Sequence, residues 1–202
     1  MIRVLEGKTI ESTDKIMLMN ELKFYSKNPR VYSKLRTILG EREPSQEEIF
    51  DLMRKQEHVR DLKRQIKDAG ALREAVIVNM NTMEVVEGNS RLAAYRLLYE
   101  ADPMKWAEIS CEILPENITQ GQIDELISTT NDGKLKWSPA EEAAWVWRFA
   151  KDEELTVEQI STKCNLNPTL LSGVMNFLYH SDQILSKSKN KFKRSKGAKN
   201  FR

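Results

Sequence analysis

Residues 84–96 read EVVEGNSRLAAYR, and this stretch decides the fold. Its first residues form a β-branched run typical of a strand, Gly88 permits a tight turn, and Asn89 can cap the helix that follows. A strand that turns directly into a helix gathers unpaired backbone N–H groups and the positive end of the helix dipole at one point. The stretch therefore predicts a site for an anionic group, typically a phosphate.

Two charged side chains flank this turn. Arg91, in the first turn of the predicted helix, is placed to add a bidentate contact to a phosphate. Glu87, just before the turn, can bind a metal, position a water or orient Arg91. The alternative is that Glu87 and Arg91 only form a local ion pair beside an ordinary turn, because Gly-x-x-Arg is a short pattern.

The surroundings of this stretch resemble the ParB/sulfiredoxin superfamily. Residues 84–96 are similar to the Gly-Glu-Arg-Arg box of the ParB partition proteins. Residues 27–32 (KNPRVY) look like the family's Asn-Pro-Arg segment, and residues 58–78 (HVRDLKRQIKDAGALREAVIV) look like the helix, glycine and strand that lead into the box. Residues 126–145 (LISTTNDGKLKWSPAEEAAW) look like the segment in which an Asn precedes a Ser-Pro and two glutamates. The resemblance implies an α/β (α+β) ParB/sulfiredoxin-like domain followed by an all-α helix-turn-helix domain.

The resemblance also implies a ligand, a nucleoside triphosphate (CTP or ATP) with Mg²⁺. The residues that match the family's nucleotide site are Gly88, Asn89, Ser90, Arg91, Arg30 and Asn131, and those that match its metal site are Glu87 and Asn131. One segment departs from the family pattern. Asn131 is followed by Asp-Gly-Lys in place of Asn-Glu and an Arg, so that Lys134 or Lys136 would replace the Arg. Nucleotide binding is therefore better supported than hydrolysis, and for Arg30 a solvated side chain on a plain turn is the alternative.

Charge is spread unevenly along the 202 residues. The whole chain has a net charge of +2, but residues 181–202 hold eight Lys or Arg and one Asp, a net of +7 that leaves the first 180 residues at −5. A basic, low-complexity tail of this kind suits nucleic-acid phosphate or simply promotes solubility. No apolar run reaches the length of a membrane span, so we expect a cytoplasmic protein with no membrane partner. Two Cys and two His far apart in sequence predict buried thiols and no metal cluster.

Local patterns predict the order of elements. Ser45 and Glu48 form a capping box for a helix over residues 46–69, either continuous or divided near Gln56, with Gly70 as its C-cap. Strands are expected at 75–80, 83–86 and 109–114, and helices at 89–100 and 119–128. We predict three parts: residues 1–130 as the nucleotide-binding domain, 131–182 as a helical domain and 183–202 as a tail. An insertion at residues 31–55 has no functional interpretation.

The helical part predicts DNA binding. A helix over residues 137–149 presents aromatic side chains that suit a core, with base stacking as the alternative. Residues 156–178 have the pattern of a helix-turn-helix, although any small three-helix unit can show it. Its recognition helix, residues 168–178, contains no Lys or Arg, so phosphate affinity must come from the tail. The expected DNA contacts are Thr169, Ser172, Asn176, Lys191, Lys193 and Arg194.

Three functions remain open from the sequence. The first is a ParB-like DNA-binding protein of plasmid or chromosome partition, with nucleotide, duplex DNA and a second copy of the chain as partners. The second is an enzyme of the same fold, a nucleoside triphosphatase, phosphotransferase or DNA nuclease with Glu87 as catalytic carboxylate and Arg91 as electrostatic stabiliser. The third is a plasmid or phage regulator whose phosphate site is vestigial.

Overall fold

The computed structural model describes residues 1–32, 35, 42–130, 138–164 and 171–172. The chain divides into two compact units, Met1–Trp137 and Ser138–Arg202. The expected boundaries after residues 130 and 182 remain predictions.

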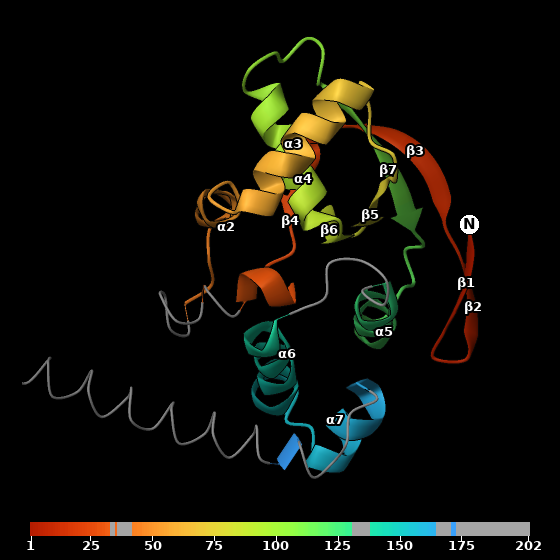
Figure 1. Cartoon of the computed structure of the whole chain (residues 1–202). Coiled ribbons are helices and arrows are strands. Elements are labelled where there is room, and N and C mark those ends of the chain that lie inside the picture. The colour runs from red at the N-terminus through yellow and green to blue at the C-terminus, as the bar shows by residue number, and fades with distance from the viewer. Residues whose placement is uncertain (33–34, 36–41, 131–137, 165–170, 173–202) are drawn as a thin grey trace, which may run out of the picture. The chain divides into compact units, whose positions relative to one another are not determined.

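A mixed five-stranded sheet forms the centre of the first unit (Figure 1). Its order is β3-β7-β5-β6-β4, with β5 parallel to β7, β4 parallel to β6, and the β3–β7 and β5–β6 pairs antiparallel. The strands are β3 (Thr13–Leu18), β4 (Lys23–Phe24), β5 (Val76–Asn79), β6 (Glu84–Glu87) and β7 (Glu108–Leu114). The expected strands and the mixed α/β class of this unit are confirmed.

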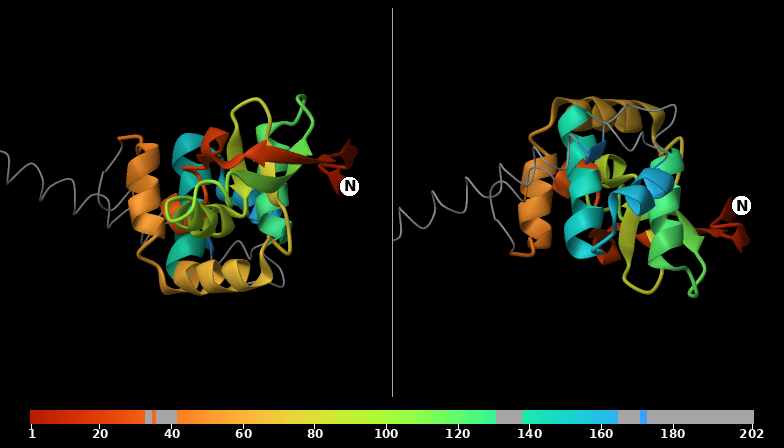
Figure 2. Two further views of the ribbon diagram at one scale, coloured as in Figure 1. Left: turned by 90° about the horizontal axis from the view of Figure 1, so that it is seen from above. Right: turned by 90° about the horizontal axis from the view of Figure 1, so that it is seen from below.

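Three helices cover one face of the sheet. They are α2 (Gln46–Met53), α3 (Glu57–Ala69) and α4 (Asn89–Tyr99), and Figure 2 shows α2 and α3 on two sides of α4. Because side chains alternate along a strand, Val76 and Val78 of β5 enter the core under these helices while Ile77 points to the opposite face. In the same core Phe24 and Phe50 stack with ring centroids 6.0 Å apart.

The helix α5 (Gln120–Thr130) contacts β6 and belongs to the other face. Ile77 and Val86 are buried on that face, and α5 buries Ile123, Leu126 and Ile127. This second, smaller layer places the C-terminal end of α5 beside the point where β6 ends.

The two ends of the sheet are closed differently. At the β4 edge, the Gln46 side chain accepts from the Phe24 N–H at 2.6 Å and donates to the Phe24 carbonyl at 3.1 Å, so an amide takes the place of a neighbouring strand. Beyond β3 an antiparallel hairpin, β1 (Ile2–Leu5) and β2 (Lys8–Glu11), extends away from the sheet (Figure 2). The hairpin is fastened by Arg3, whose guanidinium forms a bidentate ion pair with the buried Glu112 carboxylate.

The expected helix over residues 46–69 is divided. Ser45 and Glu48 make both hydrogen bonds of the capping box at the start of α2, as predicted. The break falls at Gln56, whose extended backbone (φ −78°, ψ 135°) precedes α3. Gly70 ends α3 with φ 77°, the left-handed conformation predicted for its C-cap.

In the second unit α6 (Pro139–Asp152) and α7 (Val157–Cys164) contact each other. Ser138 and Glu141 form the capping box of α6. A buried guanidinium, that of Arg148, lies 4.2 Å from the centroid of the Trp145 ring and pairs with Glu153 at 2.8 Å. The aromatics of α6 are therefore core residues, as the sequence indicated.

Only Leu171 and Ser172 of the predicted recognition helix lie in the described part of the chain. Leu171 is buried, and both residues are helical. The helix-turn-helix therefore stays a prediction. No described helix combines the length and apolar composition that crossing a bilayer requires.

Cys111 lies in the middle of β7, where burial raises the pKa of its thiol to about 12. At pH 8 only about one such thiol in ten thousand is ionised, and the thiolate is the reactive form. In a Cys164→Ser chain we expect Cys111 to resist a maleimide in the native protein and to react within minutes in denaturant. Rapid labelling of the native chain would show that β7 opens readily.

Candidate nucleotide-binding site

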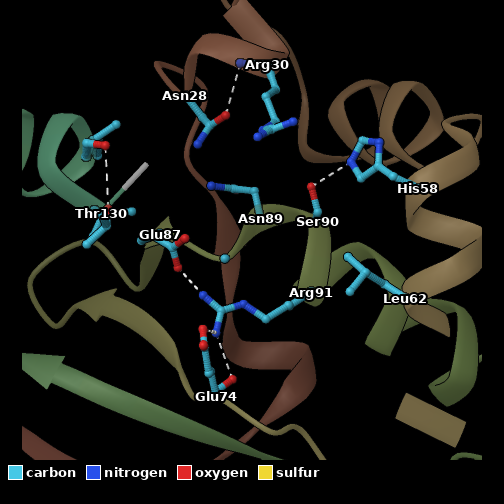
Figure 3. A pocket seen from close by; sticks show the side chains of 13 residues that line it. Asn28, Arg30, His58, Leu62, Glu74, Glu87, Asn89, Ser90, Arg91 and Thr130 are labelled. Carbon is cyan, nitrogen blue, oxygen red and sulfur yellow. Dashed lines mark hydrogen bonds and ion pairs between the residues drawn. The ribbon is translucent and has the colours of Figure 1, made fainter. Parts of the chain in front are cut away.

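A cleft of about 300 Å³ lies where β6 passes into α4 (Figure 3). Its lining comes from segments far apart in sequence: the turn before residue 32, the start of α3, the approach to β5, the β6–α4 junction and the end of α5. The polar residues that line it are Asn28, Arg30, His58, Glu74, Glu87, Asn89, Ser90, Arg91 and Thr130. Volumes of a few hundred cubic ångströms are typical of small-ligand sites.

The junction itself depends on Gly88. Its φ of 98° is left-handed, and it serves as the N-cap residue of α4, with its carbonyl accepting the first helical hydrogen bond from the Leu92 N–H at 2.9 Å. A Cβ at this position would lie 3.0 Å from both the Arg91 Nη2 and the Val76 Cγ1. By helix geometry the N–H groups that follow have no intrahelical acceptor, and the residues that carry them, Asn89, Ser90 and Arg91, line the cleft.

Asn89 corrects one prediction. It was expected to cap the helix, but it is the first residue of α4 and makes no side-chain capping bond. Its side chain is buried, with Oδ1 accepting from the Tyr25 N–H at 3.0 Å and Nδ2 donating to the Val85 carbonyl at 2.7 Å. The amide thus joins the chain after β4 to β6, and only the backbone of Asn89 remains available to a ligand.

Arg91 is held by the protein. Its Nη1 donates to the carbonyls of Glu74 and Ala75, each at 2.8 Å, and its Nη2 pairs with the Glu87 carboxylate. The Glu74 carboxylate lies 3.4 Å from Nη1. The local ion pair that was the alternative interpretation is therefore present, and a phosphate contact by Arg91 would require it to exchange partners.

Asn28 and Arg30 lie on the rim of the cleft. The Asn28 side chain accepts from the Arg30 N–H at 3.1 Å, and the Asn28 carbonyl accepts from Val31 and Tyr32, so the predicted turn is the start of a short helical segment. Figure 3 shows the Arg30 side chain directed toward the start of α4. Arg30 therefore lines the same cleft as Gly88 and Arg91, and its contact with a nucleotide remains a prediction.

His58 is a site residue that the sequence did not reveal. Its Nε2 lies 2.9 Å from the Ser90 Oγ, across the space between α3 and α4. In the sequence this histidine was considered only as a possible metal ligand, and that role was rejected. Nothing in the sequence near His58 indicates that it lies opposite Ser90. One feature of the sequence could have pointed to it. His58 lies in the first turn of the helix that precedes β5, β6 and the Gly-x-x-Arg segment.

Several predicted site residues lie outside the described residues. They are Asn131, Thr169, Asn176, Lys191, Lys193 and Arg194, together with Lys134 and Lys136. Ser172 is described and half-buried beside Leu171. All roles assigned to these side chains remain predictions.

The carboxylates of the cleft decide how well a magnesium ion fits. Within the described ranges no group of three or more His, Cys, Asp or Glu could hold a metal ion, and Glu87 is paired with Arg91. Mg²⁺ usually binds through substrate phosphates and one or two carboxylates. The described residues thus fit an ion that arrives with a nucleotide and do not form a resident metal site.

Comparison with known proteins rests on structure. No family model and no curated protein matches the sequence. The structure of a Pnob8-like ParB-N domain matches with a TM-score of 0.51 at 12% identity, over 79% of this chain and 66% of that chain. The chain thus spans just under two thirds of that structure's length. The C-terminally truncated chromosome-partitioning protein ParB from Caulobacter crescentus, complexed with CTP-γ-S, matches with a TM-score of 0.38 at 14% identity, over 83% and 79% of the two chains.

The first match defines the fold. The first unit has a mixed α/β fold in which β6 passes through Gly88 directly into α4. In particular it is the fold of a ParB N-terminal domain, which confirms that part of the expected class. The wider sulfiredoxin assignment and the site residues remain predictions.

The buried Asn89 amide allows a test of the junction. Asn89→Asp replaces the N–H donor that faces the Val85 carbonyl with a second acceptor, so we expect the free energy of unfolding to fall by about 3 kcal/mol at pH 7, more than in Asn89→Ala. In the folded variant the pKa of this carboxyl would be raised, so the deficit should narrow as pH falls toward 4. Urea denaturation measures both effects.

Asn20 provides the matched control, because it is exposed. Asn20→Asp makes the same chemical change and should alter the free energy of unfolding by no more than about 0.5 kcal/mol. Equal free energies of unfolding for the two Asp variants would contradict the proposal that the Asn89 amide joins the chain after β4 to β6.

Proposed function

We propose that the first unit binds a nucleoside triphosphate in the cleft at Gly88–Arg91 and that the second unit, with the basic tail, binds duplex DNA, as in a ParB-like partition or plasmid regulator. The observation that carries the proposal is the convergence in one cleft of a left-handed glycine, the start of an eleven-residue helix and the Arg30 side chain.

The cleft supports an anionic ligand on electrostatic grounds. The first N–H groups of α4 present partial positive charge, and Arg30 adds a full charge from another segment. The terminal phosphates are the part of a nucleotide that such a site recognises. The resemblance of residues 84–96 to the family's box makes CTP or ATP the first ligands to test.

The arrangement of Glu87 favours binding over hydrolysis. A carboxylate that acts as a general base must reach the water or hydroxyl it activates, whereas the Glu87 carboxylate pairs with Arg91 and is half-buried. Among the described residues that line the cleft, the other carboxylate is that of Glu74, and the Arg91 guanidinium lies between it and the Glu87 carboxylate. We therefore place the enzyme alternative second.

DNA binding is supported by the sequence and by the helical second unit. The predicted recognition helix lacks basic residues, and residues 183–202 contain all eight Lys and Arg of the tail. We therefore assign the contacts with DNA phosphates, which position the protein on the duplex, to the tail. The contacts with base edges are assigned to Thr169, Ser172 and Asn176.

Arg30→Gln tests the nucleotide site without breaking the Arg91 ion pair. We expect the affinity for CTP or ATP with Mg²⁺ to fall by roughly ten- to a hundredfold, the usual cost of one charge-assisted contact. Calorimetric titration measures it. Arg73→Gln, an exposed arginine that does not line the cleft, removes the same charge and should bind as the unaltered chain does.

Equal affinities of the Arg30 and Arg73 variants would place the nucleotide elsewhere. Absence of binding for all four ribonucleoside triphosphates in the unaltered chain would refute the nucleotide proposal. Glu87→Gln, measured under the same conditions, distinguishes an enzyme from a binding protein. Loss of nucleotide hydrolysis with retained nucleotide binding would identify an enzyme.

Deleting residues 183–202 tests the DNA proposal. The plot of log affinity against log salt should flatten by several units, near 0.9 for each phosphate that the shortened chain no longer neutralises, while the preference among DNA sequences persists. Replacing Thr169, Ser172 and Asn176 by Ala should do the opposite and mainly reduce sequence discrimination. Fluorescence anisotropy over a salt series measures both, and no affinity at about 50 mM salt in the full chain would refute DNA binding.

A further inference from the structure

We infer that His58 takes up a proton when a phosphate group binds in the cleft, so that the site binds phosphate compounds more tightly as pH falls. The inference rests on the proposed nucleotide site and adds to it a recognition residue supplied by a different helix.

The geometry comes from two helices that pack side by side. His58 is the second residue of α3 and Ser90 the second residue of α4, and α3 and α4 are in contact. The His58 Nε2 lies 2.9 Å from the Ser90 Oγ, and both side chains line the cleft into which Arg30 points (Figure 3). A phosphate held by the first N–H groups of α4 would therefore meet the hydroxyl and the imidazole together.

The donors and acceptors of this pair are compatible with a protonated imidazole. A hydroxyl has one proton to donate, and with an unprotonated Nε2 that proton is directed to the imidazole. A phosphate oxygen needs donors, so the Ser90 hydroxyl is most useful when it donates to the phosphate and accepts from Nε2–H. Both the neutral Nε2–H tautomer and the imidazolium can make that donation, but only the imidazolium adds a positive charge beside the phosphate, and this charge is what favours proton uptake. The proton comes from solvent, and no covalent bond other than N–H forms.

The charges around His58 make its protonation state decisive. Arg30 faces the cleft from the segment before residue 32 and Arg91 from α4, while Glu74 faces it from the approach to β5 and Glu87 from the end of β6. The two guanidinium charges are therefore matched by the two carboxylates. On α3 itself the charged neighbours are Glu57, Arg60 and Asp61, and Asp61 is paired with Arg64. Protonated His58 thus gives a balanced cleft a net charge of the sign that attracts phosphate.

The size of the effect follows from linkage. Imidazole ordinarily titrates near pH 6.5, and a bound phosphate raises that value because it stabilises the charged form. At pH values between the titration point of His58 in the free protein and that in the phosphate-bound protein, the affinity for phosphate falls by up to about tenfold for each unit of pH increase. Above both points the dependence ends, because His58 then stays neutral in either state.

The experiment compares the unaltered chain with His58→Gln, which keeps a hydrogen-bonding group but cannot be protonated. CTP with Mg²⁺ and inorganic triphosphate are titrated calorimetrically at about pH 5.5 to 8, the range in which histidine changes charge. The terminal phosphate also titrates near pH 6, but that effect is common to all variants and cancels in the comparison. His180→Gln is the matched control, since it removes the chain's other histidine.

We expect the affinity of the unaltered chain and of His180→Gln to fall more steeply with pH than that of His58→Gln, by about tenfold over the range. Titrations near neutral pH in two buffers of different ionisation heat should show up to one more proton taken up per ligand than in His58→Gln. A parallel pH dependence in all three chains would overturn the inference while leaving the nucleotide site standing. Failure of all three to bind either ligand at any pH would overturn the nucleotide site itself.

A measurement on the unaltered fold guards against a damaged variant. The imidazole carbon resonances of His58, assigned by their disappearance in His58→Gln, report its titration directly. They should shift to a higher titration point when inorganic triphosphate is added. An unchanged titration point in the ligand-saturated protein would also overturn the inference.

Discussion

The left-handed backbone of Gly88 is the constraint on which the rest of the first unit depends. With φ at 98°, the chain passes from the last residue of β6 into α4 without an intervening loop. This places the buried Asn89 amide where it joins the chain after β4 to β6, and it brings the start of α4 to the edge of the sheet. A larger residue would need both a rare backbone conformation and the space already filled by Arg91 and Val76. The position of α4 and the cleft at its start therefore share one cause.

The Gly-x-x-Arg pattern has a different meaning in the folded protein from the one its spacing suggests. The glycine and the arginine are neighbours in space, but the guanidinium points to the carbonyls of Glu74 and Ala75 and to Glu87, where it holds the entry to β5 against the exit from β6. Recognition of an anion then depends on the backbone of α4 and on side chains from elsewhere, Arg30 and His58. A half-buried arginine with four acceptors around it serves first to shape the cleft.

Sequence reasoning succeeded where the cause of a structure is local. The capping box at Ser45 and the C-cap at Gly70 are made by residues within a few positions of each other, and each has the predicted geometry. It failed where a side chain is fixed by a distant segment. Asn89 satisfies every local criterion of a cap, yet its oxygen accepts from Tyr25, which is 64 positions away. The pairing of His58 with Ser90 spans 32 positions and has no local signature.

The ion pair between Arg3 and Glu112 bears on how the N-terminal hairpin relates to the sheet. Glu112 is buried on β7, and its carboxylate is bound by Arg3 and by the Ser12 hydroxyl, both supplied by the first twelve residues. Without the hairpin, Glu112 would be a buried carboxylate on an interior strand that has lost the Arg3 guanidinium with which it pairs. The projecting hairpin thus supplies the positive charge that pairs with the buried Glu112 carboxylate. It forms part of the folding unit and is not a detachable arm.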